Sequence, residues 1–167
     1  MWVIPILVFA AIIVIISIIR KDNMSKTKMA ELASLPIGLE VCHNPNPVRA
    51  SLDGRSGRKY TWLYSTTVKA LNDDVEITEF GAFSWHNGQW IFSTIYARPF
   101  TQEEFAEWYS CPKAIIRKSE VVTDPNNYSG ADVLISSKAK WYFIGITKSG
   151  RRVKGEAVVE EQAQVRE

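Results

Sequence analysis

Two patterns of hydrophobic and polar positions divide this chain. The first is a continuous apolar run from Trp2 to Ile19, which contains no ionisable side chain and ends at Arg20. A helix over residues 1–19 is about 28 Å long, close to the roughly 30 Å hydrocarbon core of a bilayer. A cleaved signal peptide needs a basic start, a shorter apolar core and small residues at its cleavage site, and this segment offers none of them. The pattern therefore predicts a transmembrane anchor at residues 1–19.

The second pattern, from residue 36 onward, is a series of short β-like runs divided by turn residues. The clearest run is residues 60–71, where Tyr60, Trp62 and Tyr64 occupy alternate positions, so one face of this strand is expected to be buried. The Asn87-Gly88 pair predicts a tight hairpin turn, because both residues readily adopt the positive φ that such a turn needs. Further strands are predicted at residues 37–42, 75–85, 89–97, 113–122, 131–136, 140–147 and 152–160.

A short helix interrupts the β pattern after Phe100. Thr101 and Glu104 have the spacing of a capping box, and Phe100 with Phe105 has the spacing of a hydrophobic staple, so the helix start is specified twice. Phe105, Trp108 and Tyr109 share one face of this helix. Since exposed aromatic side chains often mark binding surfaces, these three residues are the candidate interaction surface.

Short antiparallel hairpins without a repeated βαβ alternation are typical of a mostly β fold. We predict an antiparallel β-sandwich over residues 36–161, with an immunoglobulin- or fibronectin-like architecture and one short helix; a small barrel is the alternative. Residues 20–35 are predicted to be a polar juxtamembrane linker with an amphipathic turn or two, and residues 162–167 a disordered tail.

The charges of the chain restrict its partners and its orientation. The chain has 20 Lys and Arg against 18 Asp and Glu, a formal net charge of +2. This is too small for the basic surface of most nucleic-acid-binding proteins, so no nucleic acid partner is expected. Arg20, Lys21, Lys26 and Lys28 follow the apolar run. By the positive-inside rule, this flank and the domain after it lie on the cytoplasmic side of a cell membrane.

The chain has two cysteines and two histidines: Cys42, His43, His86 and Cys111. Together they are possible ligands for zinc or copper, although no compact spacing such as C-x-x-C occurs among them. A disulfide between Cys42 and Cys111 is a second reading, and it would require an oxidising compartment. Two unpaired buried thiols without any cofactor are the third. The sequence leaves these alternatives open.

Cations gather in the loop before residue 60. Arg55, Arg58 and Lys59 lie there between glycines, but the loop lacks the spacing of a phosphate-binding P-loop. Joined by Arg151 and Arg152 from the last predicted hairpin, they form a candidate basic patch that could attract anionic lipid headgroups. A solvated, mobile loop is the alternative.

No G-x-S-x-G elbow occurs, and the few histidines offer little support for a nucleophile and its base. The sequence therefore predicts a membrane-anchored, non-catalytic binding or scaffolding module within a membrane-associated assembly. Its partners are the lipid bilayer, through residues 2–19, and a membrane protein. The alternatives are a metal-binding or redox domain that uses the Cys and His set, and a sugar- or ligand-binding sandwich that uses exposed tryptophans.

Overall fold

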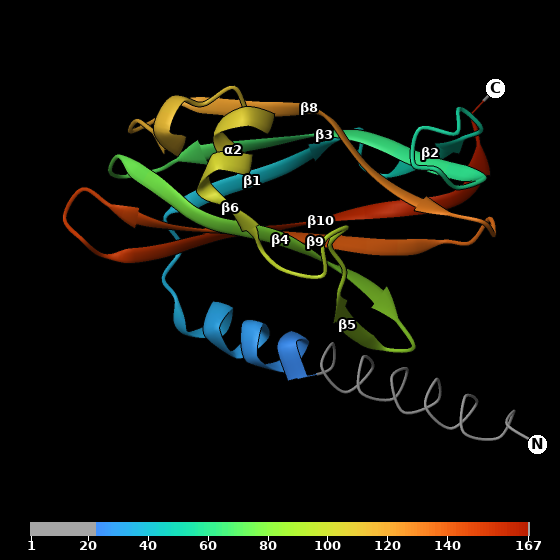
Figure 1. The fold of residues 1–167 in the computed structure, drawn as a ribbon, viewed down its shortest axis with the longest axis horizontal. Helices are drawn as coiled ribbons and strands as arrows, with labels where there is room; N and C mark the ends of the chain where they lie inside the picture. The colour runs from blue at the N-terminus through green and yellow to red at the C-terminus, as the bar shows by residue number, and fades with distance from the viewer. Residues whose placement is uncertain (1–22, 167) are drawn as a thin grey trace, which may run out of the picture.

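The computed structural model describes residues 23–166, and the fold of this part is mostly β (Figure 1). Helical residues 23–34 come first. The later elements are β1 (Leu39–Asn44), β2 (Val48–Ser51), β3 (Tyr60–Ala70), β4 (Val75–His86), β5 (Gln89–Phe92), β6 (Phe100–Thr101), α2 (Gln102–Trp108), η1 (Pro112–Ala114), β7 (Ile115–Ile116), β8 (Val121–Ala131), β9 (Ser137–Thr147) and β10 (Arg152–Val165). The anchor predicted at residues 1–19 lies outside the described residues. Within residues 23–166, no helix is long and apolar enough to cross a membrane.

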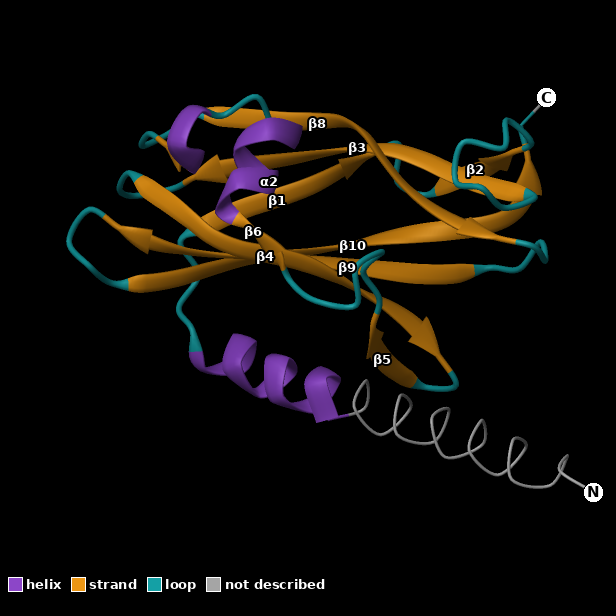
Figure 2. Cartoon of the chain, viewed as in Figure 1, coloured by secondary structure: helices purple, strands orange, loops and turns teal. Residues whose placement is uncertain are grey.

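The strands form one curled sheet with the order β1-β3-β2-β10-β9-β4-β5, in which β8 pairs with β3 while β6 and β7 pair with β4. The pairings between these strands are antiparallel except for that of β2 with β10. Because the sheet curls, β1, β3 and β8 lie over β4, β9 and β10, as Figure 2 shows. The predicted mostly β fold with a short helix between strands is confirmed.

Local patterns placed some strands correctly and others not. The alternation in β3 is confirmed, because Trp62, Tyr64, Thr66 and Val68 are all buried. The strand predicted at residues 113–122 is wrong: this stretch holds η1 and the two-residue β7, and β8 begins only at its end. The strand predicted at residues 131–136 is a loop after its first residue.

The predicted end of the domain needs a second correction. β10 continues to Val165, so most of the tail predicted to be disordered is strand. The N–H of Arg166 also donates to the carbonyl of Ala50, with an N–O distance of 2.8 Å. The parallel pairing with β2 supplies these backbone partners, and nothing in the local sequence announces it.

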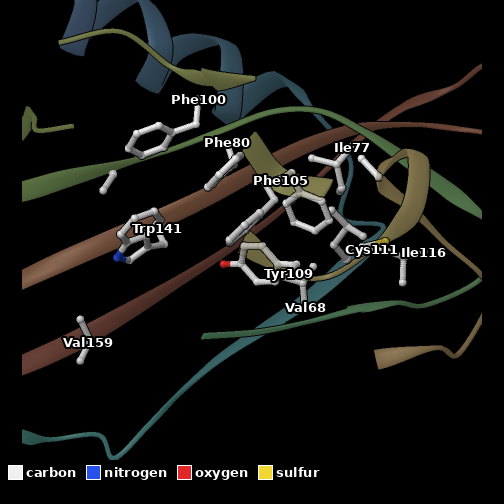
Figure 3. Close-up of a cluster of buried hydrophobic side chains, with 14 of the residues drawn as sticks. Val68, Ile77, Phe80, Phe100, Phe105, Tyr109, Cys111, Ile116, Trp141 and Val159 are labelled. Carbon is white, nitrogen blue, oxygen red and sulfur yellow. The ribbon is translucent and has the colours of Figure 1, made fainter. Parts of the chain in front are cut away.

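Helix α2 fills one side of the space between the two layers. The hydroxyl of Thr101 accepts the N–H of Glu104, and the Glu104 carboxylate accepts the N–H of Thr101 at 2.6 Å, which confirms the predicted capping box. Phe105 is fully buried and its ring meets that of Phe80 edge-on, with 5.6 Å between the ring centroids. Figure 3 shows Phe80, Phe105, Tyr109 and neighbouring side chains gathered in this core.

Residues 23–34 pack on the outer face of the sheet, against β4, β5 and β9. Leu32 is 1% exposed and belongs to a second apolar cluster with Phe83, Phe92, Tyr142 and Ile144. The hydroxyl of Ser25 accepts the backbone N–H of Phe92 at 2.8 Å, and the ammonium group of Lys28 donates to Glu79 of β4 at 2.6 Å and to Glu31 of its own helix. The described part of the predicted linker is therefore docked on the domain, because the sheet, and not solvent, covers its apolar face.

Candidate ligand-binding groove

A groove runs between β8 and the strands β4, β5 and β9, and it consists of three hollows in a row. The first hollow has a volume of about 380 Å³ and the second of about 370 Å³. Rings and polar groups that line the first include Phe100, Glu107, Trp108, Asp124, Asn127 and Trp141. The side chains that line the second include Trp62, Trp85, Ser129, Ile135 and Glu161.

The third hollow, of about 450 Å³, joins the other two. It shares Tyr128 and Trp141 with the first hollow, and Ser129 and Gly130 with the second. We call the three together the β8 groove. Each hollow by itself is in the size range of small-molecule sites in proteins.

A hydrogen bond across the two layers holds the floor of the groove. The indole N–H of Trp141, on β9, donates to the hydroxyl of Tyr64, on β3, with an Nε1–Oη distance of 2.8 Å. The Tyr64 hydroxyl also lies 3.5 Å from Oγ of Ser129, on β8. Burial raises the pKa of Tyr64 well above its usual value, so this hydroxyl keeps its proton at neutral pH and is a fixed donor and acceptor.

A β-bulge aims two polar side chains of β8 at the interior. Tyr64 pairs with Asn127 and Thr66 pairs with Asp124, so three steps along β8 match two along β3. In a regular strand, positions 124 and 127 would face opposite sides, but here both side chains are buried. Pro125 lies inside the bulge. A residue at this position need not donate an N–H to the neighbouring strand, so the proline costs no hydrogen bond of the sheet.

Asp124 supplies the carboxylate of the first hollow. It is 8% exposed, and its Oδ1 accepts the backbone N–H of Asn126 at 2.9 Å. Burial raises the pKa of Asp124, and the hydrogen bond from Asn126 only partly opposes this. The adjacent Asn127 is held from behind, because its amide donates to Oγ1 of Thr66 at 2.9 Å.

Glu161 supplies the carboxylate of the second hollow. It is 7% exposed, and its Oε1 has no hydrogen-bond partner among the described residues. Burial raises the pKa of Glu161, while Ser129 acts to lower it. Asp124, Asn127 and Glu161 were all missed from the sequence. The proline within an apolar-flanked run is the one local signal of the bulge, and nothing local singles out Glu161.

The four candidate metal ligands are not brought together. His43 is buried on β1, where its Nδ1 lies 3.0 Å from Oγ1 of Thr66, and burial lowers its pKa to about 4. His86 ends β4 and lines the second hollow. Within residues 23–166, no group of three or more His, Cys, Asp or Glu side chains is placed to hold a metal ion.

The alternative of a disulfide is also wrong for this structure, since Cys42 and Cys111 are free thiols. Cys42 is exposed on β1, whereas Cys111 is buried beyond α2, with its S–H donating to the carbonyl of Ile115 at 3.3 Å. Burial raises the pKa of the Cys111 thiol. Cys111 belongs to the buried core whereas Cys42 is exposed to solvent, so the two thiols do not meet.

The aromatic face of α2 is core and not an exposed interaction surface. Phe105 is 0% exposed and Tyr109 2% exposed, and their stacked rings lie 4.3 Å apart. Trp108 meets Phe80 edge-on at 5.4 Å, and only its remaining surface contributes to the first hollow. The helix closes the space between the layers, so its apolar face turns inward.

The candidate basic patch splits into two separate groups. Arg55, Arg58 and Lys59 precede β3, whereas the hairpin with Arg151 and Arg152 lies beyond the other end of this 11-residue strand, about 35 Å away. Arg58 pairs with Asp132 at 2.8 Å, and Arg152 pairs with Glu31 of the N-terminal helical residues. The predicted single patch is therefore wrong.

No protein-family model and no curated protein sequence matches this chain. Two solved structures are similar at low sequence identity. The crystal structure of a putative ApaA protein from Bordetella pertussis is 8% identical, with a TM-score of 0.44 over 75% of this chain and 94% of that chain. The X-ray structure of the structural-genomics target SoR45 is 12% identical, with a TM-score of 0.40 over 75% of this chain and 88% of that chain.

Proposed function

We propose that this protein is a membrane-associated, non-catalytic binding module of the immunoglobulin- or fibronectin-like sandwich kind, which binds a small ligand in the β8 groove. The observation that carries the proposal is the groove itself, since aromatic rings line it and its polar groups are aimed inward from three different strands. Sites of this composition bind small molecules through apolar contact, while a few fixed polar groups set orientation.

The groove is preorganised for binding. Trp141 is held by Tyr64, Asn127 by Thr66, and Asp124 by its own backbone turn. Groups that are already fixed lose little conformational entropy when a ligand arrives, so more of the interaction energy contributes to affinity. This arrangement supports a binding role, and the proposal assigns no residue to catalysis and no metal to the site.

The membrane part of the proposal rests on the uncharged run at residues 2–19 and on the cations that follow it. These cations favour a domain on the cytoplasmic side. Residues 23–34, which follow that run in the sequence, are docked on the sheet, because Leu32 and Lys28 tie them to strands β4 and β9.

A variant in which the β8 groove is blocked tests the proposal. Intrinsic tryptophan fluorescence of the full chain in detergent micelles reports on ligands, because Trp62, Trp85, Trp108 and Trp141 line the groove. A panel of saccharides, amines and amino acids is titrated against the wild type and Ser129→Phe, which fills the junction of two hollows. Thr123→Phe, on the same strand but outside the groove lining, is the matched control.

We expect at least one ligand to change the emission of the wild type and of Thr123→Phe, and to have no effect on Ser129→Phe. A panel without any response, or a response that survives in Ser129→Phe, would contradict binding in the β8 groove. Far-ultraviolet circular dichroism of both variants establishes that they are folded.

A further inference from the structure

The β8 groove carries an excess of negative charge although the chain does not. The formal net charge of the chain is +2. The lining of the three hollows nevertheless contains the carboxylates of Glu107, Asp124 and Glu161 and, among the described residues, a single Lys or Arg, which is Arg58. Arg58 already donates to Asp132 at 2.8 Å. A ligand in the groove therefore meets uncompensated carboxylates.

One oxygen of these carboxylates lacks a hydrogen-bond partner among the described residues. Glu161 is 7% exposed, lines the second hollow, and has an Oε1 that accepts no hydrogen bond within the described chain. A buried charged group without a partner is destabilising, because it has lost its hydration without compensation. A ligand that donates a hydrogen bond and brings positive charge to this carboxylate would remove the penalty and favour its ionised form, whereas a neutral ligand would offer no charge to stabilise that form.

The acidic groups lie at the two ends of the groove. Asp124 pairs with Thr66, and Ser129, beside Glu161, pairs with Trp62. The two β8 positions are thus separated by four residues of β3, about 13 Å. Between them lies the middle hollow, whose lining includes Trp141, Tyr128, small neutral side chains and one cation, Arg58, which disfavours positive charge in the middle of a ligand. This order favours a ligand with cationic ends and an apolar, flexible middle.

We propose that the β8 groove binds a linear aliphatic polyamine, with one terminal ammonium group at Glu161 and the other beside Asp124 and Glu107. The methylene segments contact the side chains of Trp141 and Tyr128 in the middle hollow. The inference rests on the proposed function, because it names the ligand class of the same groove. A short diamine reaches only one acidic end, whereas a triamine or tetramine reaches both.

Calorimetric titration of the full chain in non-ionic detergent tests this assignment. Spermidine and spermine are the probes, 1,4-diaminobutane is the short analogue, and a neutral oligosaccharide and trilysine are the comparison ligands. The variants are Glu161→Gln and Asp124→Asn. Glu160→Gln is the matched control, because Glu160 is the exposed neighbour on β10 and its partner is Lys138, outside the groove lining.

We expect spermidine or spermine to bind the wild type and Glu160→Gln equally. The Kd is expected to rise at least tenfold in Glu161→Gln and in Asp124→Asn, and 1,4-diaminobutane is expected to bind at least tenfold more weakly than spermidine. If one of the two variants does not fold, the other variant and the comparison with 1,4-diaminobutane still test whether the groove binds a polyamine. Polyamine binding that is indifferent to both carboxylates, or equal binding of 1,4-diaminobutane, would overturn the inference.

The comparison ligands separate this inference from the proposed function. If the oligosaccharide or trilysine binds, Ser129→Phe abolishes that binding, and spermidine does not bind, the polyamine assignment is wrong and the groove remains a binding site. If no ligand of either panel binds, both proposals are wrong.

Discussion

The hydrogen bond between Trp141 and Tyr64 joins the two layers beneath the groove, and its removal is a direct test of this architecture. Tyr64 is 1% exposed and Trp141 6% exposed, so neither group has ready access to water. Tyr64→Phe keeps the ring and its packing but removes the acceptor of the indole N–H, which has a donor–acceptor distance of 2.8 Å in the native protein. The variant therefore removes this hydrogen bond, together with the longer 3.5 Å contact to Oγ of Ser129, without changing the packing of the ring.

The expected magnitude follows from the buried donor that this substitution leaves behind. An indole N–H without an acceptor loses its hydration and gains nothing in return, which costs about 1–3 kcal/mol. Trp141→Phe removes the donor as well as part of a large ring, so by itself it costs about 2–4 kcal/mol. In the double variant no orphaned N–H remains, and the two effects should therefore fall short of additivity by about 1–2 kcal/mol.

Urea unfolding of the full chain in detergent, followed by circular dichroism, measures all three variants. Tyr142→Phe is the matched control, because the Tyr142 hydroxyl is buried but has no hydrogen-bond partner among the described residues. Its loss should not lower the free energy of unfolding, because this hydroxyl has lost its hydration without gaining a partner. If Tyr64→Phe is no more destabilising than Tyr142→Phe, or if the effects of Tyr64→Phe and Trp141→Phe simply add, the bond does not hold the layers together.

Three further predictions follow from the described contacts. Leu32→Ala should lower the free energy of unfolding by about 3 kcal/mol and expose residues 23–34 to hydrogen exchange, whereas the exposed Thr27→Ala in the same helix should do neither; equal effects would contradict the docking. Burial raises the pKa of Glu161, so the native state holds this proton at pH values where the unfolded state has lost it, and stability falls as pH rises through the native pKa. Urea unfolding is measured from about pH 4, near the usual pKa of carboxyl groups, to about pH 8. The free energy of unfolding should decline less over this range in Glu161→Gln than in the wild type, and an equal decline would refute the assignment of this pH dependence to Glu161. In cells, a membrane-impermeant maleimide should label Cys42 only after permeabilisation and without reduction, and Cys111 only after unfolding, while labelling of intact cells would place the domain outside the cytoplasm.

Local sequence patterns predicted the elements whose stability is itself local. The alternation in β3, the Asn87-Gly88 hairpin turn and the capping box of Thr101 each depend on residues a few positions apart, and all three are confirmed. The last part of β10 could not be found in this way, because the carbonyl and N–H groups that pair with it belong to β2, far away in the chain. The same holds for Cys42 and Cys111, whose separation depends on how the layers pack.

The sequence by itself therefore determined the mostly β character of the domain, the main turns and the short helix, since backbone propensity and side-chain periodicity act over short distances. Only the tertiary structure decided the site. The bulge that turns Asp124 and Asn127 inward depends on the register of β8 against β3, and Glu161 reaches the groove because the end of β10 packs beside β2 and β9. The curl of the sheet likewise decided that the aromatic face of α2 is buried. The three rings that could have formed an exposed interface instead fill the gap between the two layers.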